Sequence, residues 1–214
     1  LPNDKKISLG LLSSDGRFKR LPIEEVMELS GRAATILKLK DGVTLNTALI
    51  CHLESEVAIV SSYGRLLKLE INNESIPLMG KLAQGPLTMR LFPEEVIVRA
   101  ISIPKNEENH LIIITKNGKI KKIDLNRTRK CLKGALGQII IDLDKSQKYL
   151  DSIVDICTDK SVVSLITTKG RSARISVNQF KKISTQVLHT NLINLTENEY
   201  IEKIVPIINP KNYS

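Results

Sequence analysis

The sequence predicts an all-β, propeller-like protein of about four repeats, each holding four short strands. Three observations predict this fold class: a turn motif recurs four times at similar spacing, short apolar runs surround every copy, and the helical patterns between them are too short to change the class. With 214 residues, of which 42% are hydrophobic, the chain is long enough to bury a core. A disordered chain is therefore not expected.

The recurring turn motif reads Ser or Thr, two residues, Gly, Lys or Arg, two residues, and then Lys or Arg. Its glycines are 48, 54 and 52 residues apart, a period typical of repeat architectures. Each copy stands between two β-rich runs, where a tight hairpin needs a positive φ that Gly adopts without steric cost. We therefore expect a hairpin turn at four structural glycines: Gly16, Gly64, Gly118 and Gly170.

Each repeat has its elements in the same order. The hairpin strands come first, as in ISLGLLS and EVAIVS, and a helical stretch of a turn or two can follow, at 23–29 in the first repeat and 177–183 in the fourth. Next comes a loop that contains Gly in the first three repeats, such as MGKLAQG or LKGALG, and an apolar strand such as VTLNTALI closes the repeat. The repeats span approximately 6–55, 56–109, 110–160 and 161–207 of a single domain.

The composition argues against several classes of protein. The longest uncharged apolar runs are far shorter than the roughly 20 residues of a membrane span. The three cysteines, Cys51, Cys131 and Cys157, are odd in number and too far apart for a zinc knuckle, which favours a reducing cytoplasm. The three histidines, His52, His110 and His189, are isolated in the sequence. We therefore expect no catalytic residue, no metal and no cofactor.

The net charge of +9 and the pI of about 9.5 indicate a polyanionic partner. By direct count of Lys and Arg against Asp and Glu, the first two repeats are nearly neutral, and residues 110–160 and 161–214 carry +5 and +4. The densest basic run is RTRKCLK, at 127–133, with five basic residues and no acid. The seven Phe and Tyr are too few to stack single-stranded bases, so duplex nucleic acid is the favoured partner.

The order of elements resembles the C-terminal β-pinwheel domain of bacterial type IIA topoisomerases, found in the A subunits of DNA gyrase and of topoisomerase IV. The resemblance covers about 6–207 and rests on the apolar strand, the (S/T)xxG(K/R)xx(K/R) turn, the short helical stretch, the Gly-containing loop and the final strand. It implies a β-pinwheel of four-stranded blades arranged in a circle, which exchange strands with their neighbours. It also implies a basic outer rim that bends duplex DNA.

The same resemblance implies a non-catalytic domain of an ATP-dependent isomerase, because the family's DNA-cleaving tyrosine lies in an N-terminal region absent from this chain. The chain begins with Leu1 and is expected to be a piece of a longer protein. The implied partners are double-stranded DNA, the rest of the A subunit and the ATPase B subunit, with no membrane and no small-molecule substrate. The implied location is cytoplasmic and nucleoid-associated.

Two departures from the gyrase pattern bear on the subfamily. No segment matches the QRRGGKG heptad that gyrase carries for chiral wrapping; the nearest approaches are Gly31-Arg32 and the segment at 133–137. Gyrase also usually has six blades, and four repeats are counted here. Both departures favour a topoisomerase IV-like or divergent gyrase-like protein that sets supercoiling or substrate-topology preference.

The expected DNA-binding residues are Lys and Arg of the turns, the outgoing strands and the basic run, since such side chains contact phosphates and do not read bases. Sequence preference should be weak, and the third and fourth repeats should hold DNA more strongly than the first two. The rival hypothesis is a protein-interaction β-propeller with no DNA role. The candidate DNA-binding residues are Arg17, Lys19, Arg20, Arg32, Arg65, Lys68, Lys81, Lys119, Lys121, Lys122, Arg127, Arg129, Lys130, Lys133, Arg171, Arg174, Lys181 and Lys182.

Overall fold

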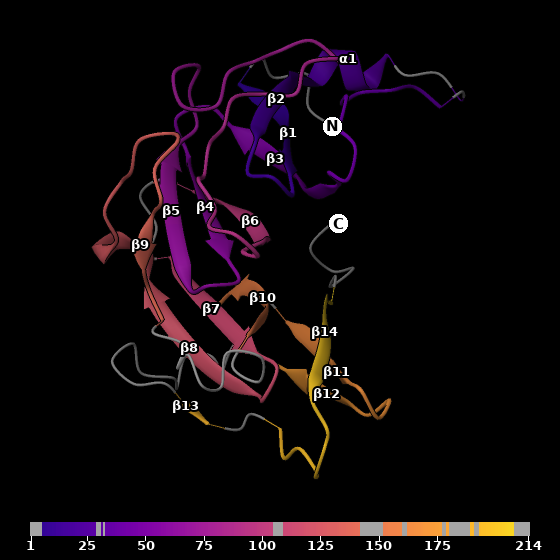
Figure 1. Cartoon of the computed structure of the whole chain (residues 1–214), viewed down its shortest axis with the longest axis vertical. Helices are drawn as coiled ribbons and strands as arrows, with labels where there is room; N and C mark the ends of the chain where they lie inside the picture. Colours follow the sequence, from indigo (N-terminus) through magenta and orange to yellow (C-terminus); the bar gives the residue numbers. More distant parts are fainter. Residues whose placement is uncertain are drawn as a thin grey trace, which may run out of the picture. The chain divides into compact units, whose positions relative to one another are not determined.

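The computed structural model describes residues 6–28, 31, 33–104, 109–141, 152–159, 162–176, 179, 189–190 and 193–207 (Figure 1). The chain divides into two compact units. The first unit holds 1–107 and 128–139, and the second holds 108–127 and 140–214. Both units are built from small antiparallel sheets, which confirms the all-β prediction.

The first sheet of the first unit is the first hairpin with one further strand. It has the order β2-β1-β3, from β1 (Ile7–Ser13), β2 (Phe18–Pro22) and β3 (Leu45–His52). A five-residue helix, α1 (Ile23–Met27), follows β2 within the stretch for which the sequence predicts one. The other predicted helical stretch, 177–183, lies outside the described residues except for Gln179.

The second sheet of the first unit has four strands. Its order is β6-β4-β5-β9, from β4 (Glu56–Ser61), β5 (Arg65–Glu70), β6 (Ile97–Ile103) and β9 (Gln138–Ile139). The strand β9 belongs to the third sequence repeat and pairs with β5 of the second repeat (Figure 1). The outermost strand of this blade is therefore supplied by the following repeat.

The first sheet receives a segment of the following repeat in the same way. Residues 78–89 of the second repeat run beside the first hairpin, where Phe18 N–H donates to the Pro86 carbonyl at 3.1 Å and Arg17 forms a bridge with Leu87. A Cβ on Gly85 would lie 2.7 Å from the Phe18 carbonyl oxygen, so this close approach of two backbones requires glycine. The exchange of strands between neighbouring blades is thus visible twice in this unit.

The second unit begins with a sheet of order β10-β7-β8-β13. Its strands are β7 (His110–Thr115), β8 (Lys119–Asp124), β10 (Ile153–Thr158) and β13 (His189–Thr190). The strand β13 comes from the fourth repeat and pairs with β8 of the third, which repeats the exchange. A short 3-10 helix, η1 (Leu125–Arg127), follows β8.

The other sheet of the second unit comes wholly from the fourth repeat. Its order is β12-β11-β14, from β11 (Val163–Thr167), β12 (Ser172–Ile175) and β14 (Ile201–Pro206). In both units the first strand of each hairpin is central in its sheet, because the closing strand of the repeat pairs on its far side. In β1, β4 and β7 nearly all residues on both faces of the sheet are buried, which explains why these strands read as almost continuous apolar runs.

Each unit has its own apolar core. In the first unit Phe18, Cys51, Val57 and Met89 belong to one cluster that joins the two sheets, and Met89 comes from the exchanged segment. Burial in this cluster raises the pKa of the Cys51 thiol to about 12. All three cysteines are free thiols. Within the described ranges, no helix is long and apolar enough to cross a membrane, and no group of three His, Cys, Asp or Glu could hold a metal.

Candidate nucleic-acid interface

The four hairpin turns share one backbone geometry. The glycines have φ between +72° and +82°, and each glycine N–H donates to the carbonyl of the Ser or Thr three residues earlier at 2.9–3.1 Å. The residue after the glycine therefore lies at the beginning of the outgoing strand or directly before it: β5 and β8 begin at this residue, and β2 and β12 begin one residue later. These basic residues are Arg17, Arg65, Lys119 and Arg171.

In the second repeat this basic residue points into the protein. The Arg65 side chain is only 5% exposed and pairs through two nitrogens with both oxygens of Glu95, the Nε–Oε1 distance being 2.9 Å. It also donates to the Arg90 carbonyl at 2.9 Å and to the Leu136 carbonyl of the exchanged loop. The Phe92 ring lies under the guanidinium, 4.6 Å from its centroid to Cζ.

The carboxylate of Glu95 is held from several directions. Besides Arg65, the Ser61 hydroxyl and the Phe92 N–H donate to it, the latter at 2.8 Å. Burial raises the pKa of the Glu95 carboxyl, but these hydrogen bonds and the guanidinium charge lower it more, so the pKa lies below its ordinary value. We call the group of Ser61, Arg65 and Glu95 the second-repeat clamp.

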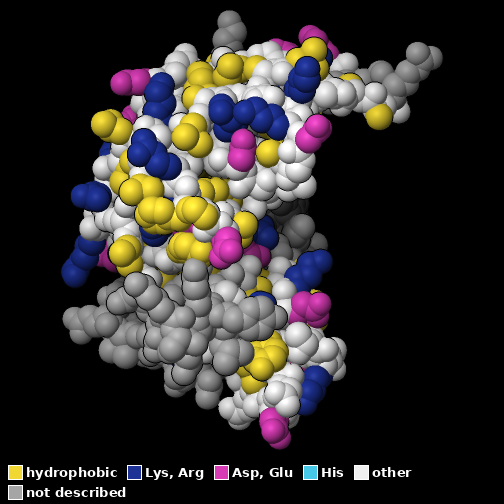
Figure 2. Space-filling model, in the orientation of Figure 1, with side chains coloured by type: hydrophobic (Ala, Val, Ile, Leu, Met, Phe, Trp, Pro, Cys, Tyr) yellow, Lys and Arg dark blue, Asp and Glu magenta, His cyan; other side chains and the backbone are white. Residues whose placement is uncertain are grey.

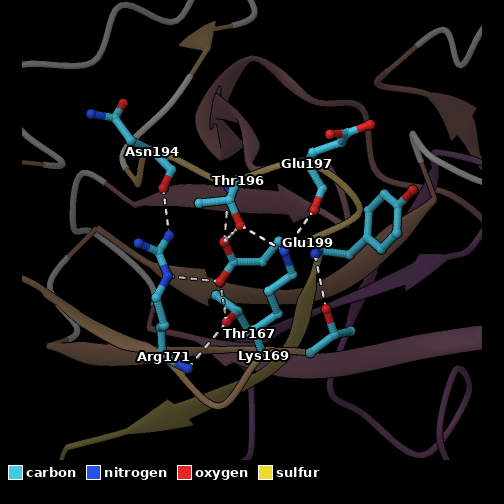
Figure 3. Close-up of polar contacts among 9 residues, drawn as sticks. Thr167, Lys169, Arg171, Asn194, Thr196, Glu197 and Glu199 are labelled. Atoms are coloured by element: carbon cyan, nitrogen blue, oxygen red, sulfur yellow. Dashed lines mark hydrogen bonds and ion pairs between the residues drawn. The ribbon is translucent and has the colours of Figure 1, made fainter.

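The fourth repeat contains the same arrangement, shown in Figure 3. Arg171 Nε lies 2.8 Å from Glu199 Oε1, and the Thr167 hydroxyl donates to the same oxygen at 2.5 Å. Thr196 donates to the second carboxylate oxygen through its N–H and its hydroxyl, both at 2.8 Å. The bond from Arg171, with the others, holds the pKa of the Glu199 carboxyl well below its usual range. Thr167, Arg171 and Glu199 form the fourth-repeat clamp.

The basic residue at the second position of the motif is also interior in three repeats. Arg20 is 2% exposed and donates to the Ile76 carbonyl at 2.6 Å and to Asn73 Oδ1 at 2.7 Å. Burial lowers the pKa of the Arg20 guanidinium. Lys68 and Lys122 are likewise buried and lie 3.6 Å and 3.3 Å from the carboxylates of Glu56 and Asp159.

Lys19 is a further interior cation, and it binds backbone carbonyls of the following repeat. Its ammonium donates to three carbonyls, of Ile36 at 2.9 Å, Gly80 at 2.8 Å and Lys81 at 2.8 Å. Burial lowers its pKa, an effect that the charge of Glu25 opposes. The carbonyls of 80 and 81 belong to the exchanged segment, so this cation ties one repeat to the next.

The candidate DNA-binding residues therefore occupy different environments. Lys19, Arg20, Arg65, Lys68 and Lys122 are buried and bound to protein groups. Arg32, Lys181 and Lys182 lie outside the described residues. The half-buried candidates are Arg17, which is 3.3 Å from Asp15 and donates to the Gly85 carbonyl, together with Lys81, Lys119 and Lys121. The exposed ones are Arg127, Arg129, Lys130, Lys133, Arg171 and Arg174.

The basic run supplies four of the six exposed candidates. Arg127 belongs to the second unit, where its side chain is 85% exposed and lies 3.2 Å from Asp124. Arg129, Lys130 and Lys133 belong to the first unit and lie on the loop that leads to β9. Lys133 donates to the Glu74 carbonyl at 2.6 Å.

Lys130 is exposed although it bridges two acids. Its ammonium is 3.0 Å from a Glu56 oxygen and 3.7 Å from a Glu70 oxygen. The hydrogen bond from Lys130 to Glu56 raises the pKa of the lysine. This lysine therefore anchors the loop to β4 and β5 while about half of its side chain still faces solvent.

Two features were not found from the sequence. The clamp acids Glu95 and Glu199 each stand two residues before the residue that pairs with the motif Ser or Thr, Ile97 and Ile201. The sequence signal that could have revealed them is an acid at this same position in FPEEVI and TENEYI. The second feature is a patch of hydrophobic side chains, with Lys and Arg among them, on one face of the first unit, as Figure 2 shows. The large hydrophobic side chains exposed within 78–87 and 132–139 are Leu78, Leu82, Leu87, Leu132, Leu136 and Ile139, the last of them in β9.

Hairpin repeats that lend an outer strand to the preceding blade define a propeller-like repeat protein of the β-pinwheel class. The family model described as DNA gyrase C-terminal domain, beta-propeller, matches residues 11–52, 109–148 and 162–207, more than half of the chain. The chain belongs to this family, which confirms the resemblance recognised in the sequence.

Similar proteins carry both subfamily names. The chain is 22% identical over 191 residues to the DNA gyrase A subunit of Mycolicibacterium smegmatis, covering 89% of this chain and 22% of the relative. It is 24% identical over 214 residues to the DNA topoisomerase 4 A subunit of Synechocystis sp., covering 94% and 23%. The chain thus spans about a fifth of the length of these curated relatives.

Solved structures share the fold. A DNA gyrase A C-terminal domain matches with a TM-score of 0.77 and 19% identity, over 97% of this chain and 68% of that one. The C-terminal domain of a DNA topoisomerase IV matches with a TM-score of 0.79 and 19% identity, over 96% and 64%. At 19% identity the likeness establishes the fold.

Proposed function

We propose that this chain binds and bends duplex DNA as the C-terminal DNA-wrapping or DNA-steering domain of a type II DNA topoisomerase A subunit. The observation that carries the proposal is membership of the gyrase C-terminal domain family over more than half of the chain. The net charge of +9 supports it, because duplex DNA is a dense polyanion.

The DNA contacts are assigned to cations that reach solvent. The buried motif cations hold the blades together, so phosphates meet the exposed set instead. Among the candidate residues, the exposed ones are Arg127, Arg129, Lys130, Lys133, Arg171 and Arg174. Every member belongs to the third or fourth sequence repeat, where the charge excess of the sequence lies.

The domain steers DNA and leaves cleavage to another part of the topoisomerase. Catalysis would need a nucleophile or metal group, and the proposal assigns none to this chain and no cofactor. The partners proposed by family membership are the rest of the A subunit and the ATPase B subunit, in a nucleoid-associated, cytoplasmic complex. The unmatched gyrase heptad supports a topoisomerase IV-like or divergent gyrase-like protein.

The experiment is a binding titration with a fluorescent duplex of about 40 base pairs between 50 and 300 mM salt. If about six phosphates are contacted, the slope of log K against log salt should be near −5, from about −0.9 per contact. Duplexes of unrelated sequence should bind alike. A protein that shows no binding at 50 mM salt, or a flat salt dependence, contradicts the proposal and favours a protein-interaction propeller.

A further inference from the structure

Leu132 is the most exposed large hydrophobic side chain in the described part of the chain, at 81%. Single exposed leucines are common on protein surfaces and need no explanation. This one stands near the end of the basic run, between Lys130 and Lys133, where a polar residue would serve solubility better. An exposed apolar side chain among cations therefore suggests a binding partner that has both apolar and anionic groups.

The backbone on both sides of Leu132 is fixed. Cys131 N–H donates to the Lys68 carbonyl at 2.8 Å, and Ala135 N–H donates to the Leu132 carbonyl at 3.2 Å. Gly134 N–H donates to the Thr88 carbonyl at 2.7 Å. These bonds attach the turn to β5 and to the exchanged segment of the second repeat, so the leucine is presented at a rigid tip.

The charge around Leu132 distinguishes it from other exposed apolar side chains. Arg129, Lys130 and Lys133 lie within three residues of it, and all three are exposed. Lys130 and Lys133 each use part of their hydrogen-bonding capacity on protein groups, while their ammonium groups keep further N–H donors for phosphates. By contrast Met27, 59% exposed, belongs to a helix with two acids in its first turn.

An exposed apolar side chain between cations can help to bend duplex DNA. Smooth bending of DNA is resisted, whereas an apolar side chain inserted between base pairs from the minor groove unstacks them and kinks the helix by 20–90°. Cations on either side of the wedge can hold the phosphates that flank the groove. A polar tip could bind phosphate but could not replace the lost stacking contact.

We propose that Leu132 inserts into the minor groove of bound duplex DNA and kinks it. This inference rests on the proposed function, since it needs DNA on the surface around the basic run. It assigns bending to a residue that carries no charge. Kinks should form most readily at pyrimidine–purine steps such as TA and CA, which unstack easily.

The test uses the 214-residue chain and a 30-base-pair duplex with 2-aminopurine beside a central TA step and a dye pair at its ends. Binding of the wild-type chain should raise the 2-aminopurine fluorescence and increase end-to-end energy transfer. Leu132→Ala should lose most of both signals, while its affinity falls by less than about threefold because the cations remain. Leu132→Phe should retain both signals, and Met27→Ala is the matched control that behaves as wild type.

The outcomes separate the two proposals. If Leu132→Ala bends and unstacks the duplex as wild type does, insertion of Leu132 into DNA is refuted while the proposed DNA binding stands. The exposed leucine would then be assigned to contact with a protein partner. If the wild-type chain binds without a 2-aminopurine signal, the wedge is refuted as well. If the wild-type chain fails to bind duplex at low salt, the proposed function fails and the wedge with it. Thermal melting confirms that each variant is folded.

Discussion

The second-repeat and fourth-repeat clamps use the same chemical groups in different surroundings. Each joins a motif hydroxyl, a motif arginine and a glutamate, yet the Arg65 side chain is 5% exposed and that of Arg171 is 47% exposed. The difference comes from the exchanged loop: Arg65 donates to the Leu136 carbonyl of the following repeat, and Arg171 donates to Asn194 of its own repeat. An arginine at a repeated position thus becomes interior when the next repeat covers it.

The largest expected effect separates the two clamps by stability. Arg65→Ala leaves Glu95 as a buried carboxylate without its cation, and breaking a buried ion pair costs about 3–5 kcal/mol. Arg171→Ala removes a half-exposed side chain that solvent partly replaces, so its loss of unfolding free energy should be clearly smaller. Urea denaturation of both variants measures the two values. Equal losses would mean that the exchanged loop adds nothing to the second-repeat clamp.

Two glycines with positive φ, one in the exchanged loop and one in a hairpin turn, extend the comparison to the backbone. Gly137 has φ +80°, and a Cβ there would lie 2.6 Å from the Leu66 carbonyl oxygen. Gly170 has φ +72° and open space around its missing Cβ. Gly170→Ala should cost about 1–2 kcal/mol for the left-handed conformation alone. Gly137→Ala should cost more, because the outer strand must move away from β5.

The measurement is the thermal midpoint of each glycine variant, with hydrogen exchange at the amides of β5 as a local probe. Loss of protection at β5 in Gly137→Ala alone is the expected pattern. Similar midpoints for the two variants, with β5 still protected, would show that the outer strand adapts without loss.

The clamp acids predict an acid-sensitive fold. The pKa of Glu95 is lowered in the folded chain, so its carboxylate stabilises the fold fully above its unfolded pKa of about 4.3 and loses this contribution as the pH falls toward the folded value. Wild-type stability should therefore decline below about pH 4.5. Glu95→Gln should be less stable at pH 7 and show a shallower decline, measured by urea denaturation from pH 7 to 3. If the unfolding free energies of both proteins decline in parallel as the pH falls, Glu95 does not cause the acid sensitivity.

The repeat, its hairpin turns and the all-β class could be read from the sequence because they depend on neighbouring residues. Gly16 and its three counterparts mark turns whose geometry is local. The environment of the motif cations could not be read in this way. Arg65 meets a carbonyl 71 residues later, and Lys19 meets one 61 residues later, so their burial depends on segments that the exchange brings in. A fourfold pattern of basic residues therefore indicated a repeated structural contact as well as a charged surface.

The smallest expected effect tests where the DNA lies. Arg129 is exposed on the loop leading to β9, and Lys40 is an exposed cation of the first repeat, where the net charge is small. Arg129→Ala should weaken duplex binding alike for unrelated sequences and reduce the salt slope by about 0.9, the share of one phosphate contact. Lys40→Ala should leave both quantities nearly unchanged. Both variants are measured in an anisotropy titration. If DNA follows the basic run alone, it contacts Arg129 and does not contact Lys40. Equal effects of the two variants would therefore indicate that the DNA contacts are distributed evenly over the repeats.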